Sequence, residues 1–289
     1  MRVAEVSAFG GPEVFRVVDR PEPEPGPGEV VVRIYATAIN PTDLGTRAGQ
    51  AKRRLPDLEP PFVPGWDLAG ELADTGERVV GMIPFVAIGG RVGAYAEAAA
   101  VDPDWLAPLD ASVSFEVGAT LPLNALTANE ALERLGLAPG SRLLVTGASG
   151  AVGGFATQLG AAAGLEVVAV ASDGDEDWVA GNGAAEVLPR DADLSAIDPV
   201  DGVFDAVPLG PDVSTGALRD GGPSLFTRPP GDTFLVSPNQ PALAALSRKL
   251  AAGELRTRVA KVLPLDQVAE GHRLAEAGGL RGKVVLAIR

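Results

Sequence analysis

Cysteine is absent from this 289-residue chain, and histidine occurs only once, at His272. Without cysteine there is no disulfide, no thiolate chemistry and no zinc site that needs sulfur. A single histidine also excludes a metal site built from several histidines. His272 could still act as an acid or base, but its segment has the spacing of a helix, and we expect its side chain on the surface.

Long apolar runs and an excess of basic residues are missing as well. No stretch approaches about eighteen uninterrupted apolar residues, and the first residues lack the basic and apolar blocks of a signal peptide. The net charge of −14 gives no electrostatic footprint for nucleic acid or an anionic membrane. Because 46% of the residues are hydrophobic, a globular core is expected. We therefore expect a soluble cytoplasmic protein that acts on small molecules.

The first third of the chain has the pattern of β structure. Residues 3–8 and 14–18 predict a hairpin, and the proline-rich residues 21–28 predict a surface connector. A β-branched strand is expected at 29–39. Further strands are predicted at 68–72, 78–83 and 94–101. Short strands divided by glycine and proline indicate a compact barrel-like unit.

From about residue 114 the pattern changes to alternating helices and strands. This alternation predicts βαβ units and a doubly wound parallel sheet, so the fold class is α/β. Helices are predicted at 115–119, 126–135, 152–163, 176–181, 241–252 and 266–277, and strands at 143–147, 166–171, 186–188, 203–207, 224–227, 233–236, 259–263 and 283–288.

The segment 142–154 is the most informative stretch of the chain. A short apolar strand stops at Gly147, and Gly150 and Gly153 follow at intervals of three residues before a helix. In this arrangement Gly147 permits a tight turn, Gly150 allows close approach of backbone to a pyrophosphate, and Gly153 allows tight packing of the helix. Ala151 and Val152 would donate backbone N–H groups to the phosphates. The alternative is an ordinary glycine-rich turn.

The end of the next strand selects between the two nicotinamide cofactors. Ala171 stands where an NAD enzyme carries an acidic residue, Ser172 leaves room for a 2′-phosphate, and Arg190 could supply a positive charge. These residues favour NADPH over NADH. The acidic residues within 173–177 oppose a phosphate if they point inward.

Several motifs together resemble a known family, the zinc-independent, quinone oxidoreductase-like branch of the medium-chain dehydrogenase/reductase superfamily. The resemblance runs from end to end. The motifs that carry it are Ala38-Ile-Asn-Pro-Thr-Asp43, Pro64-Gly-Trp-Asp-Leu-Ala-Gly-Glu71, Gly93-Ala-Tyr-Ala-Glu97, Leu121-Pro-Leu-Asn-Ala-Leu-Thr-Ala128, the Gly147–Gly153 loop and Arg281-Gly-Lys-Val-Val285.

The resemblance implies a GroES-like β-barrel substrate domain and a Rossmann dinucleotide-binding domain, with the active site in a cleft between them. The expected boundaries are 1–117, completed by 255–289, for the first domain and 118–254 for the second. It also implies a homodimer that forms through the late strands around 224–236.

Two departures from the zinc-dependent relatives argue against a metal. Those relatives resemble this chain but carry cysteine near Asn40 and a Gly-His-Glu motif where this chain has Gly65-Trp66-Asp67. Without a Lewis acid, alcohol oxidation is a poor hypothesis. Hydride transfer to a quinone or an α,β-unsaturated carbonyl remains feasible, because the charge spreads onto oxygen.

The resemblance also assigns residue roles. Asn40 and Asp43 resemble the pair beside the nicotinamide, where an amide can hold a substrate carbonyl or a carboxamide; the alternative is a turn that caps a short helix. Thr127 resembles a threonine that binds the cofactor, unless it only bonds its own helix. The remaining expected positions are Val236 and Ser237 on the nicotinamide side, and Trp66 and Asn124 at the substrate pocket, with Trp66 alternatively a core aromatic.

Other departures leave the function partly open. Many quinone oxidoreductases carry a tyrosine at the position of Gly45, so the proton donor is unidentified here. The segments 71–76, 204–208 and 223–230 are shortened or altered. The leading hypothesis is an NADPH-dependent reductase of quinones or activated alkenes. A biosynthetic enoyl reductase and a non-catalytic NADPH-binding or sensing protein are the alternatives.

Overall fold

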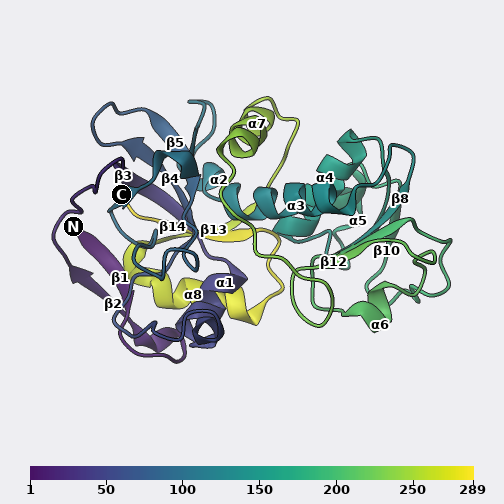
Figure 1. Cartoon of the computed structure of the whole chain (residues 1–289), viewed down its shortest axis with the longest axis horizontal. Coiled ribbons are helices and arrows are strands. Elements are labelled where there is room, and N and C mark those ends of the chain that lie inside the picture. The colour runs from purple at the N-terminus through teal and green to yellow at the C-terminus, as the bar shows by residue number, and fades with distance from the viewer. The chain divides into compact units, whose positions relative to one another are not determined.

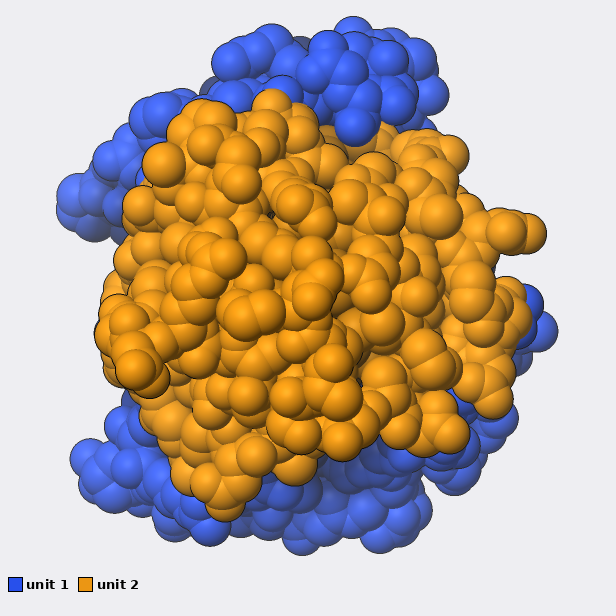
Figure 2. Space-filling view, turned by 90° about the vertical axis from the view of Figure 1, so that its right-hand side faces the viewer, with its two compact units in different colours: residues 1–123, 237–254, 258–289 blue, residues 124–236, 255–257 orange.

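The computed structural model describes all residues, 1–289, and divides them into two compact units. Unit 1 contains Met1–Leu123, Ser237–Glu254 and Arg258–Arg289 (blue in Figure 2). Unit 2 contains Asn124–Val236 and Leu255–Thr257 (orange in Figure 2). The division differs from the expected domain boundaries, since the helix after Asn239 lies in unit 1.

Unit 1 is built mainly on antiparallel strands, and only its last two strands pair in parallel (Figure 1). The strands β1 and β2 pair as a hairpin, and a seven-stranded sheet has the order β13-β14-β3-β4-β5-β7, with β6 also paired to β3. The bounds are β1 Arg2–Val6, β2 Phe15–Asp19, β3 Val30–Ala38, β4 Asp67–Leu72, β5 Arg78–Met82, β6 Ala98–Val101, β7 Leu106–Pro108, β13 Val259–Pro264 and β14 Lys283–Ala287.

Four α-helices belong to unit 1, namely α1 Pro41–Arg47, α2 Phe115–Gly118, α7 Gln240–Ala251 and α8 Val268–Ala277. Short 3₁₀ turns lie at 12–14, 50–53, 103–105 and 265–267. The hydroxyl of Ser247 on α7 donates to the carbonyl of Pro108 at 2.7 Å, which fixes α7 to the end of β7. This contact explains why α7 belongs to unit 1. None of the helices has the length and apolar character needed to cross a membrane.

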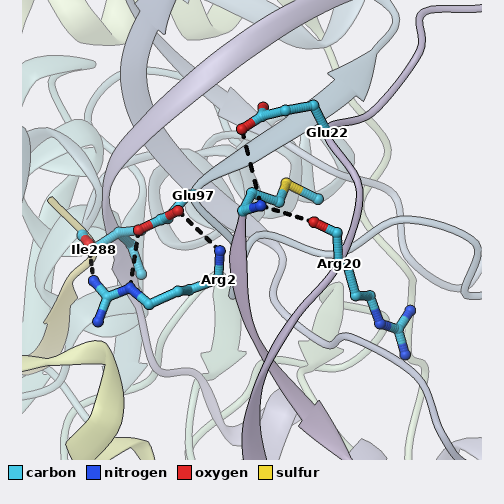
Figure 3. A network of polar contacts seen from close by, with 6 residues as sticks. Arg2, Arg20, Glu22, Glu97 and Ile288 are labelled. Carbon is cyan, nitrogen blue, oxygen red and sulfur yellow. Dashed lines mark hydrogen bonds and ion pairs between the residues drawn. The ribbon is translucent and has the colours of Figure 1, made fainter.

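Polar contacts hold β1 to its neighbours in unit 1 (Figure 3). The backbone amide of Arg2 donates to Glu97 at 2.8 Å, and its Nε donates to the same carboxylate at 3.0 Å. The Arg2 guanidinium also reaches the carbonyl of Ile288 at 3.5 Å, and the Met1 ammonium donates to the carbonyl of Arg20 at 2.7 Å. These contacts join segments that are distant in sequence.

Unit 2 contains a parallel sheet of five strands in the order β10-β9-β8-β11-β12, which confirms the expected parallel sheet and has the strand order of a doubly wound fold. The strands are β8 Arg142–Thr146, β9 Glu166–Val170, β10 Glu186–Leu188, β11 Gly202–Asp205 and β12 Ser224–Phe226. The helices are α4 Ala151–Ala162, α5 Glu176–Ala180, α6 Pro211–Ser214 and α3, which begins at Pro122 in unit 1 and runs to Leu135 in unit 2.

The strand predicted at 233–236 is wrong. Only Thr233 forms an isolated bridge, with Phe226, and the amide of Phe226 donates to the carbonyl of Asp232 at 2.9 Å. The chain returns sharply through Pro229, Pro230 and Gly231, whose φ is +118°. Such a tight return leaves no room for a full crossover, so the sheet ends at β12.

The two faces of the unit 2 sheet are covered differently. On one face Gly160 of α4 approaches Leu143 and Val167, since a Cβ at Gly160 would lie 3.2 Å from Val167 Cγ2. On the other face Leu194 and Val200, both from connecting loops, complete the core. They pack with Leu144, Val168, Val170 and Val203. One face therefore has a helix, and the other is sealed by loop side chains.

Candidate functional site

The turn between β8 and α4 leaves backbone amides without helical partners at the start of a helix. The first helical hydrogen bond runs from the Gly154 amide to the Gly150 carbonyl, at 2.9 Å. The amides of Ala151, Val152 and Gly153 precede it and have no partner within the helix. Three amides and the positive end of a 12-residue helix therefore face the same place.

Two positions of this turn require glycine for conformational or steric reasons. Gly147 has a φ of +65°, which favours glycine. A Cβ at Gly153 would lie 2.3 Å from the carbonyl oxygen of Gly147, so no side chain fits there. The backbone of the turn and the helix thus pack in direct contact. This cradle fits the pyrophosphate of a dinucleotide, because unpaired amides at a helix start bind phosphate.

The ends of β9 and β10 lie side by side at the same edge of the sheet. The Ala171 amide donates to the Leu188 carbonyl at 2.9 Å, and the Ser172 amide donates to the Ser149 hydroxyl at 2.8 Å. Ser172 is half-buried and Arg190 is exposed. The structure thus brings Ser172 and Arg190 to the carboxyl edge, as expected. Whether they bind a 2′-phosphate stays a prediction.

The acidic residues after Ser172 differ in their exposure to solvent. Asp175 is 4% exposed, whereas Asp173, Glu176 and Asp177 are exposed to solvent. The Glu176 carboxylate accepts the Gly174 amide at 3.1 Å, which holds it within its own turn. The structure therefore turns Glu176 back on its own backbone.

A buried carboxylate, which sequence reasoning missed, organises the same edge. Asp205 is the last residue of β11 and is 1% exposed. It accepts the Thr146 hydroxyl at 2.5 Å, the Val207 amide at 3.2 Å and the Gly210 amide at 2.9 Å. Asp205 thereby ties the end of β8 to the loop after β11. An acidic residue in the middle of the predicted strand 203–207 was the available signal.

The remaining expected cofactor and pocket positions are placed as follows. Thr127 is half-buried on α3, Asn124 is 4% exposed on the same helix, Val236 is buried and Ser237 is exposed. Thr127 and Asn124 each take part in polar or electrostatic contacts within the protein. Contact of these four residues with a ligand stays a prediction.

In unit 1, Asn40 and Asp43 begin α1 as a capping box. The Asn40 backbone amide donates to Asp43 Oδ2 at 2.8 Å. The expected helix-capping turn is therefore present. Its presence leaves the functional interpretation of the pair open, because both can hold at once.

The Asn40 side chain is held by two charged residues. Its Nδ2 donates to Asp67 Oδ2 at 2.8 Å and to the Ala38 carbonyl at 3.3 Å, and its Oδ1 accepts Lys283 Nζ at 2.6 Å. Asn40, Asp43, Asp67 and Lys283 form what we call the Asn40 cluster. Both amide hydrogens and the carbonyl oxygen of Asn40 are thus engaged inside the protein.

Burial shifts the pKa of every titratable group in the Asn40 cluster. It raises the pKa of Asp43 to about 7, with a further rise from the Asp67 charge, and it raises the pKa of Asp67 to about 6. Burial lowers the pKa of Lys283 to about 8, against the attraction of Asp67 and Asp43. Two carboxylates and one ammonium thus share a site that titrates near neutral pH.

A second buried network contains the only histidine. His272 is 0% exposed, so its expected surface position is wrong. Its Nδ1 faces the Arg47 guanidinium at 3.2 Å, and its Nε2 faces the Tyr95 hydroxyl at 3.1 Å. A guanidinium only donates, so Nδ1 accepts and Nε2 carries the hydrogen. Burial, with the Arg47 charge, lowers the pKa of His272 to about 3.

The Tyr95 hydroxyl connects this network to Asp43. Burial raises the pKa of Tyr95 well above its ordinary value, and the charges of Asp43 and Asp67 raise it further. Asp43 Oδ1 has no formed hydrogen bond. Arg47 in turn pairs with Glu276. The sequence signal missed here was the apolar face of α8, on which His272 lies.

Trp66 is 2% exposed, and its Nε1 has no hydrogen-bond partner. Within unit 1 it lies in the interior, as expected for a core aromatic, while its place at a substrate pocket stays a prediction. No group of three or more histidine, cysteine, aspartate or glutamate side chains is arranged to hold a metal ion.

Two family models match this chain. Residues 26–111 match the alcohol dehydrogenase GroES-like domain, and residues 182–286 match a model described as zinc-binding dehydrogenase. Among curated proteins, the quinone oxidoreductase of Lama guanicoe is 30% identical over 332 aligned positions that cover 100% of this chain and 98% of the relative. The chain belongs to the medium-chain dehydrogenase/reductase superfamily, in its quinone oxidoreductase-like branch.

Other comparisons agree with this membership. The NADPH-dependent alkenal/one oxidoreductase of Arabidopsis thaliana is 29% identical and is covered over 79% of its length by 99% of this chain. The solved quinone oxidoreductase structure from Coxiella burnetii has a TM-score of 0.89 at 27% identity, covering 100% of this chain and 99% of its own. The alignment with the Lama guanicoe protein spans 332 positions against 289 residues here, so internal segments are missing.

Proposed function

We propose that this oxidoreductase transfers a hydride from NADPH to a quinone or an α,β-unsaturated carbonyl compound, without zinc. The single observation that carries the proposal is the β8–α4 turn. Its three unpaired amides and its sterically required Gly153 form a dinucleotide site inside a member of a reductase family. When bound, the nicotinamide supplies the hydride. Relatives that are named for quinone and alkenal reduction support the acceptor class.

NADPH is the finer part of the proposal. Ser172 and Arg190 lie at the carboxyl edge of two neighbouring strands, and Arg190 has no ion pair or hydrogen bond within the protein. A free guanidinium at this edge favours a phosphorylated ribose. The Arabidopsis thaliana relative is named as NADPH-dependent.

Zinc independence rests on the chemistry of the donor set. Asn40 and Trp66 are poor metal ligands, and the Lys283 ammonium lies 2.6 Å from Asn40 Oδ1. A cation at that distance repels a second cation. We propose that the Asn40 cluster serves the reacting end of the substrate in place of a metal.

A cofactor-oxidation assay tests the function. NADPH and NADH are each mixed with a panel of quinones and enones, and the loss of reduced cofactor is followed by absorbance. Turnover with NADPH supports a reductase. Tight NADPH binding without any turnover would instead favour the alternative of a cofactor-binding or sensing protein. Preference for enone thioesters over quinones would favour a biosynthetic enoyl reductase.

The variant Arg190→Ala tests the cofactor choice. We expect the Kd for NADPH to rise about tenfold while the Kd for NADH stays unchanged, because only NADPH carries the 2′-phosphate. Arg91→Ala, at an exposed arginine of unit 1, is the matched control. An equal loss for both cofactors would contradict the assignment.

Homodimer formation and a cytoplasmic location are further expectations for this reductase. Light scattering at several concentrations tests the first, and cell fractionation tests the second. The strand edge expected to form the dimer is only three residues long, at β12.

A further inference from the structure

The Asn40 side chain has no free hydrogen-bond donor for a substrate oxygen. An enone or quinone that accepts a hydride develops negative charge on oxygen, and the site must stabilise that charge and supply a proton. Both amide hydrogens of Asn40 are already donated, to Asp67 and to the Ala38 carbonyl. Asn40 can donate to a substrate only by giving up one of these internal bonds.

Lys283 is the neighbouring group with unused donors. An ammonium has three N–H groups, and the only hydrogen bond that Lys283 Nζ donates goes to Asn40 Oδ1. Asp43 and Asp67 attract it through their charges, but neither forms an ion pair with it. Two donors of a buried cation are therefore free of protein acceptors.

Lys283 is also the most accessible member of the Asn40 cluster. It is 9% exposed, whereas Asn40 is 1% exposed and both Asp43 and Asp67 are 0% exposed. Burying an ammonium without a direct ion pair costs free energy, unless a ligand or water takes up its donors.

We propose that the Lys283 ammonium is a catalytic residue of this reductase, which binds the developing oxyanion of the substrate and gives it a proton. The inference deepens the proposed function and rests on it. As the hydride adds to the β-carbon of an enone, the electron pair of the double bond shifts toward the carbonyl oxygen. That oxygen takes one proton from Lys283, the resulting enol becomes the saturated ketone, and the neutral amine regains a proton from water.

The groups around Lys283 suit this role. Asp43 on α1 and Asp67 on β4 face it with negative charge, and burial still brings its pKa down to about 8. From α8, His272 is neutral and bonds Tyr95 and Arg47. An acid with a pKa near the working pH is well matched to general acid catalysis.

A direct test is the titration of Lys283 by NMR. The chain has four lysines, at positions 52, 249, 261 and 283, so ¹³Cε-labelled lysine gives few signals. Single Lys→Arg variants assign them. We expect the Lys283 signal to titrate near pH 8, and to move when 4-nitrophenol, which is largely a phenolate at this pH, is added to the NADP⁺-loaded protein. Titration with the other lysines, or no movement with 4-nitrophenol, would overturn the proposal.

Kinetics give an independent readout. For Lys283→Met we expect kcat to fall about 100-fold while KM and the Kd for NADPH change less than about threefold. Because the acid form of Lys283 is lost above its pKa of about 8, the wild-type kcat/KM should decline above pH 8. In Lys283→Arg the cation is kept but cannot lose its proton, so this decline should disappear. Lys261→Met, at an exposed lysine, is the control. Circular dichroism checks that each variant is folded.

The two failures are distinguishable. If the wild-type protein turns over no acceptor, the proposed function fails, while the titration still reports on Lys283. If the wild type is active and a folded Lys283→Met variant keeps its kcat, only the role of Lys283 is refuted. If that variant does not fold, the NMR experiment on the wild-type protein decides.

Discussion

Unit 1 and unit 2 each cover a β-sheet, but with different kinds of side chains and connections. Unit 1 keeps a seven-stranded sheet and buries charged groups beneath it, whereas unit 2 has five strands and seals one face with loop side chains. Unit 2 keeps its parallel strand order with this mixed cover. A parallel sheet needs covered faces, but the cover need not be helical.

The largest expected effect concerns the loop-covered face. Leu194 is 4% exposed and packs on β8, β9 and β11. We expect Leu194→Ala to lower the free energy of unfolding by about 2–5 kcal/mol, because it removes core contacts and leaves a cavity. Denaturant unfolding measures this. Leu280→Ala, at a leucine that is 38% exposed in unit 1, should change it by less than about 0.5 kcal/mol. Equal small effects would mean that the loop face is not core.

The second effect concerns the cofactor turn. We expect Gly153→Val to raise the Kd for NADPH by about 100-fold, or about 2.7 kcal/mol, because its Cβ would lie 2.3 Å from the Gly147 carbonyl. Fluorescence titration measures binding. The neighbouring Gly154→Ala, whose Cβ would lie 3.3 Å from the Ala148 carbonyl, is the milder control. Unchanged binding in Gly153→Val would remove this turn from the cofactor site.

The effect that is smallest at neutral pH concerns the charges buried in unit 1. The pKa of His272 is 6.5 when unfolded and about 3 when folded. As pH falls through this window the unfolded chain binds a proton that the folded chain does not, so stability falls by at most about 1.4 kcal/mol per pH unit. The wild type should therefore lose stability relative to His272→Gln between pH 6.5 and pH 4.

The raised pKa values of Asp43 and Asp67 act in the opposite direction. Their folded forms hold protons at a pH where the unfolded forms have lost them, so they favour the folded state as pH falls from about 7 toward 3.8. The wild type and the His272→Gln variant share these carboxylates, so their contribution largely cancels when the two stabilities are compared. A pH-independent stability difference would contradict the low pKa of His272.

Sequence reasoning found the family, both sheets and the glycine turn, because these depend on local patterns and on motifs in a fixed order. It missed what depends on distant partners. Lys283 lies in the quoted Arg-Gly-Lys motif, yet its contact with Asn40 joins positions 243 residues apart. His272 was misplaced because a helix pattern shows which residues share a face, but not that Tyr95 and Arg47 will meet that face.

The predicted strand at 233–236 failed for a similar reason. Its residues have β character, but the return through Pro229–Gly231 sets where the chain can go. The placement of α7 also depended on a distant contact, between Ser247 and Pro108. Local propensity predicted the element types better than it predicted their neighbours.

The return after β12 has a consequence for how this chain meets other copies of itself. The carbonyl of Asp232 occupies the Phe226 amide, and Thr233 bridges to the same residue. Free backbone groups at a sheet edge are what another strand needs in order to add to it. At this edge the protein's own chain already takes one of the backbone groups, so an added strand could pair only with those that remain.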